Sequence, residues 1–244
     1  MPTQFSFKGL ALAAAGQITY PFVDTIEVQA SSALPEIGGY GSANAIDFRY
    51  RDLIRFDLAH THVIGSSINC CDDEPSHTTL LQASIEGLDV MGMITADRIV
   101  SRLMTSYKEG ATEPSVKLIG TRFENLKIAG IPVEVDLAVD LLDRYHKFGE
   151  LSQAYEKGDK DLRNLFATAT GVSRASMVRG LKPTSPGLDC RGHAVHVPGL
   201  GAVRLAEIRI TPLTRIVTMI QIDFDCPFKG RLMFCMSEDG GSPS

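Results

Sequence analysis

The segment Ile46-Asp47-Phe48-Arg49-Tyr50-Arg51-Asp52-Leu53-Ile54-Arg55-Phe56-Asp57-Leu58 decides the fold class. Apolar and charged residues alternate along it, which is the period-two pattern of a β-strand with one buried face. The alternation slips at Asp52-Leu53 and resumes at Ile54 with the same parity, so we expect a bend or bulge near Asp52. If that parity continues, Leu58 and the two histidines beyond it, His60 and His62, face the protein interior.

Strand patterns also dominate the last third of the chain. Residues 201–211, 214–225 and 228–237 predict a meander of three strands. A two-residue turn at Lys229-Gly230 would place Phe224 opposite Cys235. Only residues 137–169 break the strand pattern, with apolar residues at helical spacing and glycines that end short helices. The fold class predicted is therefore mainly β, an antiparallel sandwich or barrel-like sheet, in a single domain over 1–244 with a helical insertion at 137–169.

A short unit recurs along the chain. Residues 85–92, IEGLDVMG, resemble residues 123–130, FENLKIAG, and residues 7–12, FKGLAL, form a shorter third copy. Gly87, Asn125 and Gly9 occupy the same place in the three copies. Glycine and asparagine tolerate the left-handed backbone conformation that a β-bulge uses. We therefore expect a strand–kink–strand unit at each copy, although chance recurrence of Gly-Leu-x-Val in a β-protein is the alternative.

Composition excludes several classes of protein. The formal net charge is −5 and the basic residues are spread along the chain, so we expect no nucleic-acid partner. No run of 18 apolar residues occurs, so we expect no membrane span. Five irregularly spaced cysteines favour a reducing, cytoplasmic setting. Lys8 followed by the apolar residues 9–16 resembles a signal peptide for export, but a strand explains the same segment.

The first candidate site lies at the predicted bend and in the strand that follows. His60 and His62 are expected to face inward, and with Tyr50, Arg51 and Asp52 they are the candidate catalytic residues. Such residues would act on a small molecule inside a cavity of the barrel or sandwich, as a cyclase, isomerase or hydrolase does.

The same histidines are candidate metal ligands. Two His at i and i+2 on one strand can share an ion, and further possible ligands follow at Cys70, Cys71, Asp72, Asp73, Glu74 and His77. Residues 72–77 are polar and contain a proline, which is typical of a surface loop. We therefore predict no metal and no cofactor.

Three other groups carry charge or nucleophilic potential. Arg49, Arg51 and Arg55 could clamp a carboxylate or phosphate, although cross-strand ion pairs with the neighbouring aspartates explain them better. Asp223 and Asp225 could divide into acid and base, or simply line a solvated strand edge. The remaining group consists of Asp189, Cys190, His193 and His196, whose spacing matches no catalytic motif.

Three segments carry a family resemblance. Residues 37–43, 48–56 and 120–130 resemble a family of uncharacterised bacterial proteins of similar length, and the resemblance covers most of the chain. It implies no activity and assigns no catalytic residue. The Gly-Leu-x-Val-x-Gly units also resemble those of secreted β-proteins with variable surface anchors, which would imply a surface location.

The sequence contains neither a Walker A loop nor a Gly-x-Ser-x-Gly nucleophile elbow. We therefore expect a non-catalytic binding or assembly protein that forms a homo-oligomer through its strand edges and that can bind a small-molecule ligand. The alternative is the small-molecule enzyme described above.

Overall fold

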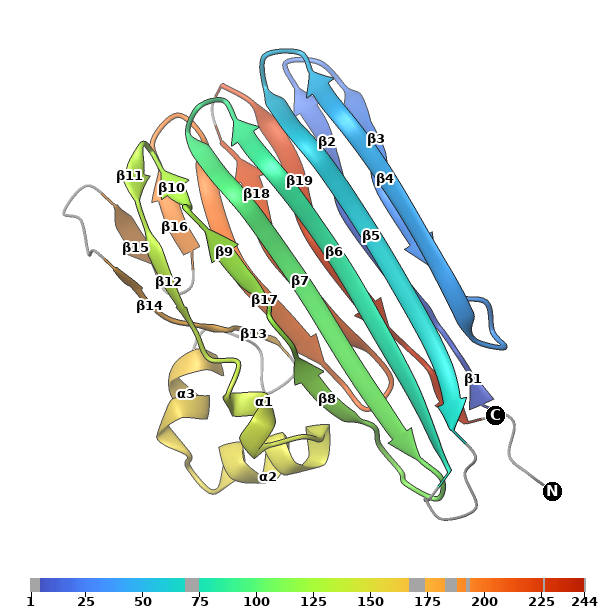
Figure 1. Ribbon diagram of the computed structural model, residues 1–244. Helices are drawn as coiled ribbons and strands as arrows, with labels where there is room; N and C mark the ends of the chain where they lie inside the picture. The colour runs from blue at the N-terminus through green and yellow to red at the C-terminus, as the bar shows by residue number, and fades with distance from the viewer. Residues whose placement is uncertain are drawn as a thin grey trace.

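The computed structural model describes residues 5–68, 75–166, 174–182, 188–191, 194–225 and 227–243. Two antiparallel sheets of eight strands each pack face to face (Figure 1), so the mainly β, sandwich-like fold predicted from the sequence is confirmed. The two sheets stay separate and do not close into a barrel. No helix in the described part of the chain is long and apolar enough to cross a membrane.

The first sheet, called the β4–β7 sheet, is built from long neighbouring hairpins. Its strands are β4 (Gly39–Tyr50), β5 (Ile54–Ile68), β6 (Ser76–Val90), β7 (Ile94–Lys108), β8 (Ser115–Leu118), β9 (Arg122–Glu124), β10 (Lys127–Ile128) and β11 (Ile131–Pro132). Strand β4 forms one edge, and β8, β9 and β10 all pair with β7 on the other side. The expected single strand over residues 46–58 was wrong, because residues 51–53 form the turn of the β4–β5 hairpin.

The second sheet, called the β17–β19 sheet, joins the N-terminal strands to the C-terminal meander. Its strands are β2 (Gly9–Tyr20), β3 (Asp24–Ala33), β13 (Arg174–Ser176), β15 (Asp189–Arg191), β16 (Ala194–Val197), β17 (Gly201–Ile210), β18 (Arg215–Phe224) and β19 (Lys229–Asp239). The three meander strands are confirmed, but their predicted register was wrong: Phe224 pairs with Gly230, not with Cys235. Residues 9–16, which resemble a signal peptide, belong to β2, between β19 and β3.

The remaining elements close the ends of the sandwich. Strand β1 (Phe5–Ser6) pairs with β20 (Ser242–Pro243), and β12 (Glu134–Leu137) pairs with β14 (Val178–Lys182). Three short helices, α1 (Leu141–Arg144), α2 (Phe148–Glu156) and α3 (Lys160–Phe166), lie at one end of the molecule (Figure 1) and fall within the predicted insertion. Asp159 caps α3 by accepting a hydrogen bond from Leu162 N at 2.9 Å.

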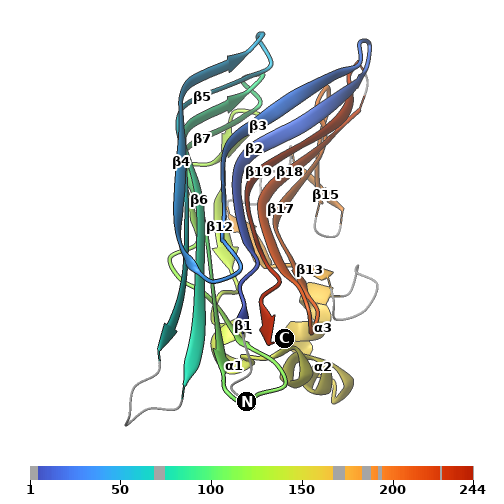
Figure 2. The same cartoon turned by 90° about the vertical axis from the view of Figure 1, so that its right-hand side faces the viewer.

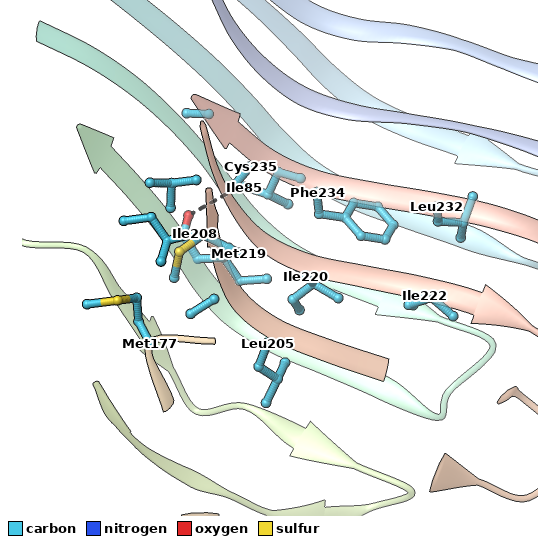
Figure 3. Packing of buried hydrophobic residues seen from close by; sticks show 14 of the residues in the cluster. Ile85, Met177, Leu205, Ile208, Met219, Ile220, Ile222, Leu232, Phe234 and Cys235 are labelled. Carbon is cyan, nitrogen blue, oxygen red and sulfur yellow. Dashed lines mark hydrogen bonds between the residues drawn. The ribbon is translucent and has the colours of Figure 1, made fainter. Parts of the chain in front are cut away.

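Buried apolar side chains fill the space between the two sheets. Figure 3 shows how Phe234, Ile220 and Leu205 from the β17–β19 sheet lie in this layer with Ile85 from β6. Fully burying one such side chain contributes about 1.5–3 kcal/mol, so the layer is the main source of stability. Because the interior is filled, a ligand or partner of the candidate functional residues has to bind on an outer face or at an edge of a sheet.

A row of kinks crosses the β4–β7 sheet. The cross-strand pairs Glu86–Arg98 and Leu88–Ala96 are formed, while Gly87 and Asp97 between them are not paired. The same interruption crosses the neighbouring strands, and we call its members the kink row: Asp47, Asp57, Gly87, Asp97 and Asn125. Asp47, Gly87 and Asn125 have φ of 51°, 68° and 51°, which are left-handed values. The kinks predicted at Gly87 and Asn125 are thus confirmed.

The third copy of the repeat behaves differently. Gly9 does not have a positive φ. A Cβ at this position would instead lie 2.7 Å from Leu81 Cδ2 and 2.8 Å from Leu34 Cδ1. Gly9 therefore packs closely against two leucine side chains and makes no left-handed kink, so the expected kink at this copy was wrong.

A second row of kinks crosses the β17–β19 sheet inside the core. Ala206 and Cys235 have φ of 46° and 51°, and both lie beside Met219 of β18 where the cross-strand pairing is interrupted. Cys235, Met219 and Met177 lie together among the buried side chains in Figure 3. Figure 2 shows the strands of this sheet bending partway along their length, as a row of bulges requires.

Candidate functional site

The kink row decides which side chains of β5 reach the surface. Before the kink, Ile54 and Phe56 are buried; after it, the buried residues are Ala59, Thr61 and Val63. Each kink places two successive residues on the same side, so the parity of the strand reverses. The prediction that His60 and His62 face the interior was therefore wrong, and both lie on the outer face of the β4–β7 sheet, away from the other sheet.

His60 and His62 lie side by side on this outer face. Their ring centroids are 6.3 Å apart, and the ring of Tyr40 on β4 meets His62 edge-on at 4.9 Å. Burial lowers the pKa of His62, and the nearby His60 and Arg102 lower it further. These surroundings therefore favour the neutral form of His62. A neutral imidazole can bind a metal or accept a proton, but no described carboxylate orients it as in a catalytic triad.

The cross-strand neighbours of the histidines are polar and uncharged: Ser42, Asn44, Gln82 and Ser84. One charged side chain, Arg102, lies beyond Gln82. Arg102 on β7 donates from Nε and Nη2 to Gln82 Oε1 at 2.9 and 2.5 Å, which fixes both side chains. Ser84, also on this face, is 5% exposed beneath its longer neighbours. The surface is thus shallow and preorganised by side-chain hydrogen bonds.

Tyr50, Arg51 and Asp52 lie at the β4–β5 turn, whereas His60 and His62 lie near the middle of β5. Tyr50 Oη donates to Asp24 Oδ2 at 2.5 Å, and Arg51 Nη2 lies 3.2 Å from the same oxygen. Arg51 Cζ also lies 3.9 Å above the centre of the Phe22 ring. Burial and then the hydrogen bond to Asp24 raise the pKa of Tyr50. Tyr50 and Arg51 therefore tie the β4–β5 turn to the β2–β3 turn.

The five candidate catalytic residues consequently do not converge on one site, and their catalytic role stays a prediction. Of the candidate metal ligands, His60, His62 and His77 lie within the described residues. Residues 70–74 lie outside the described residues, and His77 stacks on Phe5 at 4.3 Å and hydrogen-bonds to Ser67 at 2.8 Å. Within the described ranges, no cluster of three or more His, Cys, Asp or Glu could hold a metal ion.

The arginine group on β4 and β5 is divided between ion pairs and one unpaired side chain. Arg55 donates to Asp89 Oδ2 from Nε at 3.0 Å and from Nη2 at 2.7 Å, as the cross-strand interpretation predicted. Arg49 lies directly opposite Arg55 and forms no ion pair with any described residue. Both arginines line a surface groove of about 370 Å³ along the kink row, which includes Asp57 and Asp97. Sequence reasoning missed Asp97, because nothing in its own strand marks the kink.

Of the two C-terminal candidates, Asp223 forms ion pairs on the outer face of the other sheet. Asp223 lies between Arg204 and Arg231, whose Nε is 2.5 Å from Asp223 Oδ1. Burial raises the pKa of Asp223, but the hydrogen bond from Arg231 and the charges of both arginines outweigh it and hold the pKa below its usual value.

The histidine and cysteine group is only partly described. His193 lies outside the described residues, and the backbone of Asp189 pairs with His196 across β15 and β16. Its possible chemistry therefore stays a prediction.

The fold and surface define a two-sheet β-sandwich whose outer face carries polar and aromatic side chains. Residues 5–170 match the model of a family described as a domain of unknown function (DUF8256). This match covers more than half of the chain, so the chain belongs to that family. Comparisons with curated proteins and with solved structures gave no match.

Proposed function

We propose that this protein is a non-catalytic assembly module that dimerises by pairing β4 with β4 of a second copy. The observation that carries the proposal is the edge of the β4–β7 sheet, where β4 has no second strand hydrogen-bonded to it among the described residues, although Ala33 at the end of β3 lies close to Gly41. Strand β4 is 12 residues long, and β5 is the only described strand that pairs with it. On its other side, its backbone groups make no hydrogen bond to the backbone of any described residue. A row of unpaired backbone groups is a template for another strand.

The composition of β4 supports pairing. Sheet edges are usually protected by charges, prolines or short strands. Residues 39–46 of β4, GYGSANAI, contain no charge and no proline. Tyr40 and Ile46, at the two ends of this stretch, are 65% and 71% exposed. These two side chains lie on the same outer face, and water contact with them is unfavourable.

A second copy of the chain fits this edge better than an unrelated strand. In an antiparallel pair related by a twofold axis at Ala43, Tyr40 of each copy faces Ile46 of the other. An aromatic residue opposite a β-branched residue is a favourable cross-strand pair, worth about 0.2–1 kcal/mol. The same register places Ser42 opposite Asn44 and Gly41 opposite Ala45, without any like charges. The interface is isologous, so both copies use the same surface.

The environment of the candidate catalytic residues supports a non-catalytic role. Tyr50 and Arg51 hold two turns together through Asp24. Apolar side chains fill the sandwich interior where an enzyme of this type would need its cavity. We also propose a reducing, cytoplasmic setting, on the ground of the five irregularly spaced cysteines.

Light scattering coupled to gel filtration tests the proposal. The wild-type chain is expected to have twice its 26.5 kDa mass, and Ile46→Lys is expected to have the monomer mass. Leu213→Lys is the matched control, because Leu213 is 72% exposed and lies in a turn far along the chain from β4. Its mass is expected to stay that of the dimer. A monomeric wild-type chain at all concentrations, or a dimeric Ile46→Lys variant, would overturn the proposal.

A further inference from the structure

The imidazole rings of His60 and His62 have no hydrogen-bond partner among the described residues. The Nε2 atom of His62 is buried, although the side chain lies on an outer face. A buried nitrogen without a partner costs about 1–3 kcal/mol. Native folds therefore supply such an atom with a water molecule or an ion, and its isolation is a reason to look for a ligand.

We propose that His60 and His62 chelate one transition-metal ion of the Zn²⁺, Ni²⁺ and Cu²⁺ class on the outer face of the β4–β7 sheet. The two residues are at i and i+2 on β5, so their side chains share a face. A histidine nitrogen binds Zn²⁺ at about 2 Å, so two imidazoles on a tetrahedral ion have centroids about 5 Å apart, and about 6.4 Å is the limit for nitrogens on opposite sides of the ion. The observed 6.3 Å is about 1 Å longer than the tetrahedral value. A rotation of the two side chains toward each other is therefore part of the proposed binding.

The surroundings select the class of ion. Across the strands, His60 lies between Asn44 and Ser84, and His62 lies between Ser42 and Gln82. None of these four neighbours is a carboxylate, so the site lacks the oxygen ligands that Ca²⁺ and Mg²⁺ require. Imidazole favours Zn²⁺, Ni²⁺ and Cu²⁺. The positive charge of Arg102 opposes a cation, but its guanidinium is turned to Gln82 by two hydrogen bonds.

Two protein ligands leave the other positions of the ion open. Zinc sites with open positions hold water or an external ligand there. The site is therefore a place where an exchangeable molecule can bind through the ion, beside Tyr40. This inference goes beyond dimerisation, because the histidines lie on β5 and not on the pairing edge of β4.

Isothermal titration calorimetry of the full-length protein with Ni²⁺ tests the site directly. Electron paramagnetic resonance of the Cu²⁺-loaded protein shows whether nitrogen atoms are ligands of the ion. The titration is done in the Cys70→Ser, Cys71→Ser background, which removes other soft ligands near in sequence. His60→Gln and His62→Gln are each expected to weaken binding at least about 10-fold, since loss of even an indirect contact to a metal ligand costs about that much. Each should also reduce the imidazole nitrogens coupled to Cu²⁺ in the spectrum from two to one.

His77→Gln is the matched control, because His77 already has Ser67 and Phe5 as partners. This variant is expected to bind as tightly as its parent. Absence of one-to-one binding by the parent, or equal binding by the His60 and His62 variants, would overturn the proposal. Circular dichroism of each variant shows whether the fold is retained. If His62→Gln is unfolded, Ni²⁺ binding by His60→Gln decides whether the proposal holds.

Discussion

The carboxylate of Asp57 occupies the space that a side chain at Gly87 would need. A Cβ added at Gly87 would lie 2.6 Å from Asp57 Cγ and 3.2 Å from Asp57 Cβ. Gly87 also has φ of 68°. Glycine is thus required twice at the centre of the kink row, once by the backbone conformation and once by the neighbouring strand.

Gly92 has only the first of these two requirements: its φ is 66°, and no atom lies within 4 Å of an added Cβ. A comparison of Gly87 with Gly92 therefore isolates the contact with Asp57. Gly92→Ala is expected to cost about 1–2 kcal/mol from the left-handed backbone alone. Gly87→Ala should cost more, and adding Asp57→Ala should return the loss to the Gly92→Ala level. Urea unfolding measures all three free energies. Equal losses for the two single variants would show that the Asp57 contact does not matter.

The ion pair of Arg215 and Asp239 is the most deeply buried charge pair among the described residues, with both side chains 2% exposed and Nη1 3.2 Å from Oδ2. Asp239→Asn leaves the Arg215 charge uncompensated and is expected to destabilise the fold by about 3–5 kcal/mol. Arg55→Ala breaks a pair with Asp89 in which Arg55 is 65% exposed, and should cost at most about 1 kcal/mol. Comparable losses in urea unfolding would contradict this ranking.

Stability at acid pH should depend on Asp223, whose pKa is lower in the folded protein than in the unfolded chain. A lowered carboxyl pKa stabilises the fold above the unfolded value of about 3.9, and this contribution is lost as pH falls through the folded pKa. Asp223→Asn should therefore be less stable than wild type at pH 7, with a difference that shrinks toward pH 3. Urea midpoints across this range measure the difference, which should not be constant.

Cys235 is fully buried, and its Sγ donates to Ile99 O at 3.7 Å. Burial raises the pKa of this thiol well above its usual range, so almost no thiolate forms at neutral pH. We expect iodoacetamide to leave Cys235 unmodified in the native protein and to modify it in urea. Mass spectrometry of the peptide that contains Cys235 gives the readout. Rapid modification under native conditions would indicate that this part of the core opens.

The repeat in the sequence predicted the kinks at Gly87 and Asn125, because glycine and asparagine mark left-handed positions locally. The kinks at Ala206 and Cys235 carry no such mark: their φ values are 46° and 51°, and both lie where the pairing with β18 is interrupted. A kink that depends on the neighbouring strands cannot be recognised from the sequence of its own strand.

That limitation explains the error at the candidate site. Without the kink at Asp57, the alternation through Ile54 and Phe56 continues to His60 and His62 and places them inside. With it, the parity reverses and the histidines reach the surface. The prediction of the fold class rested on many strands, so one local error did not change it. The predicted direction of the His60 and His62 side chains rested on the parity of one strand, so a single kink made it wrong.

The most direct test of β4 pairing is a charge exchange across the predicted twofold axis. Tyr40→Lys and Ile46→Glu alone each place an unpaired charge in the seam and should give monomers by light scattering. In the double variant, each introduced lysine faces the introduced glutamate of the second copy, so the dimer mass should return. A double variant that remains as monomeric as the two single variants would contradict the pairing of Tyr40 with Ile46.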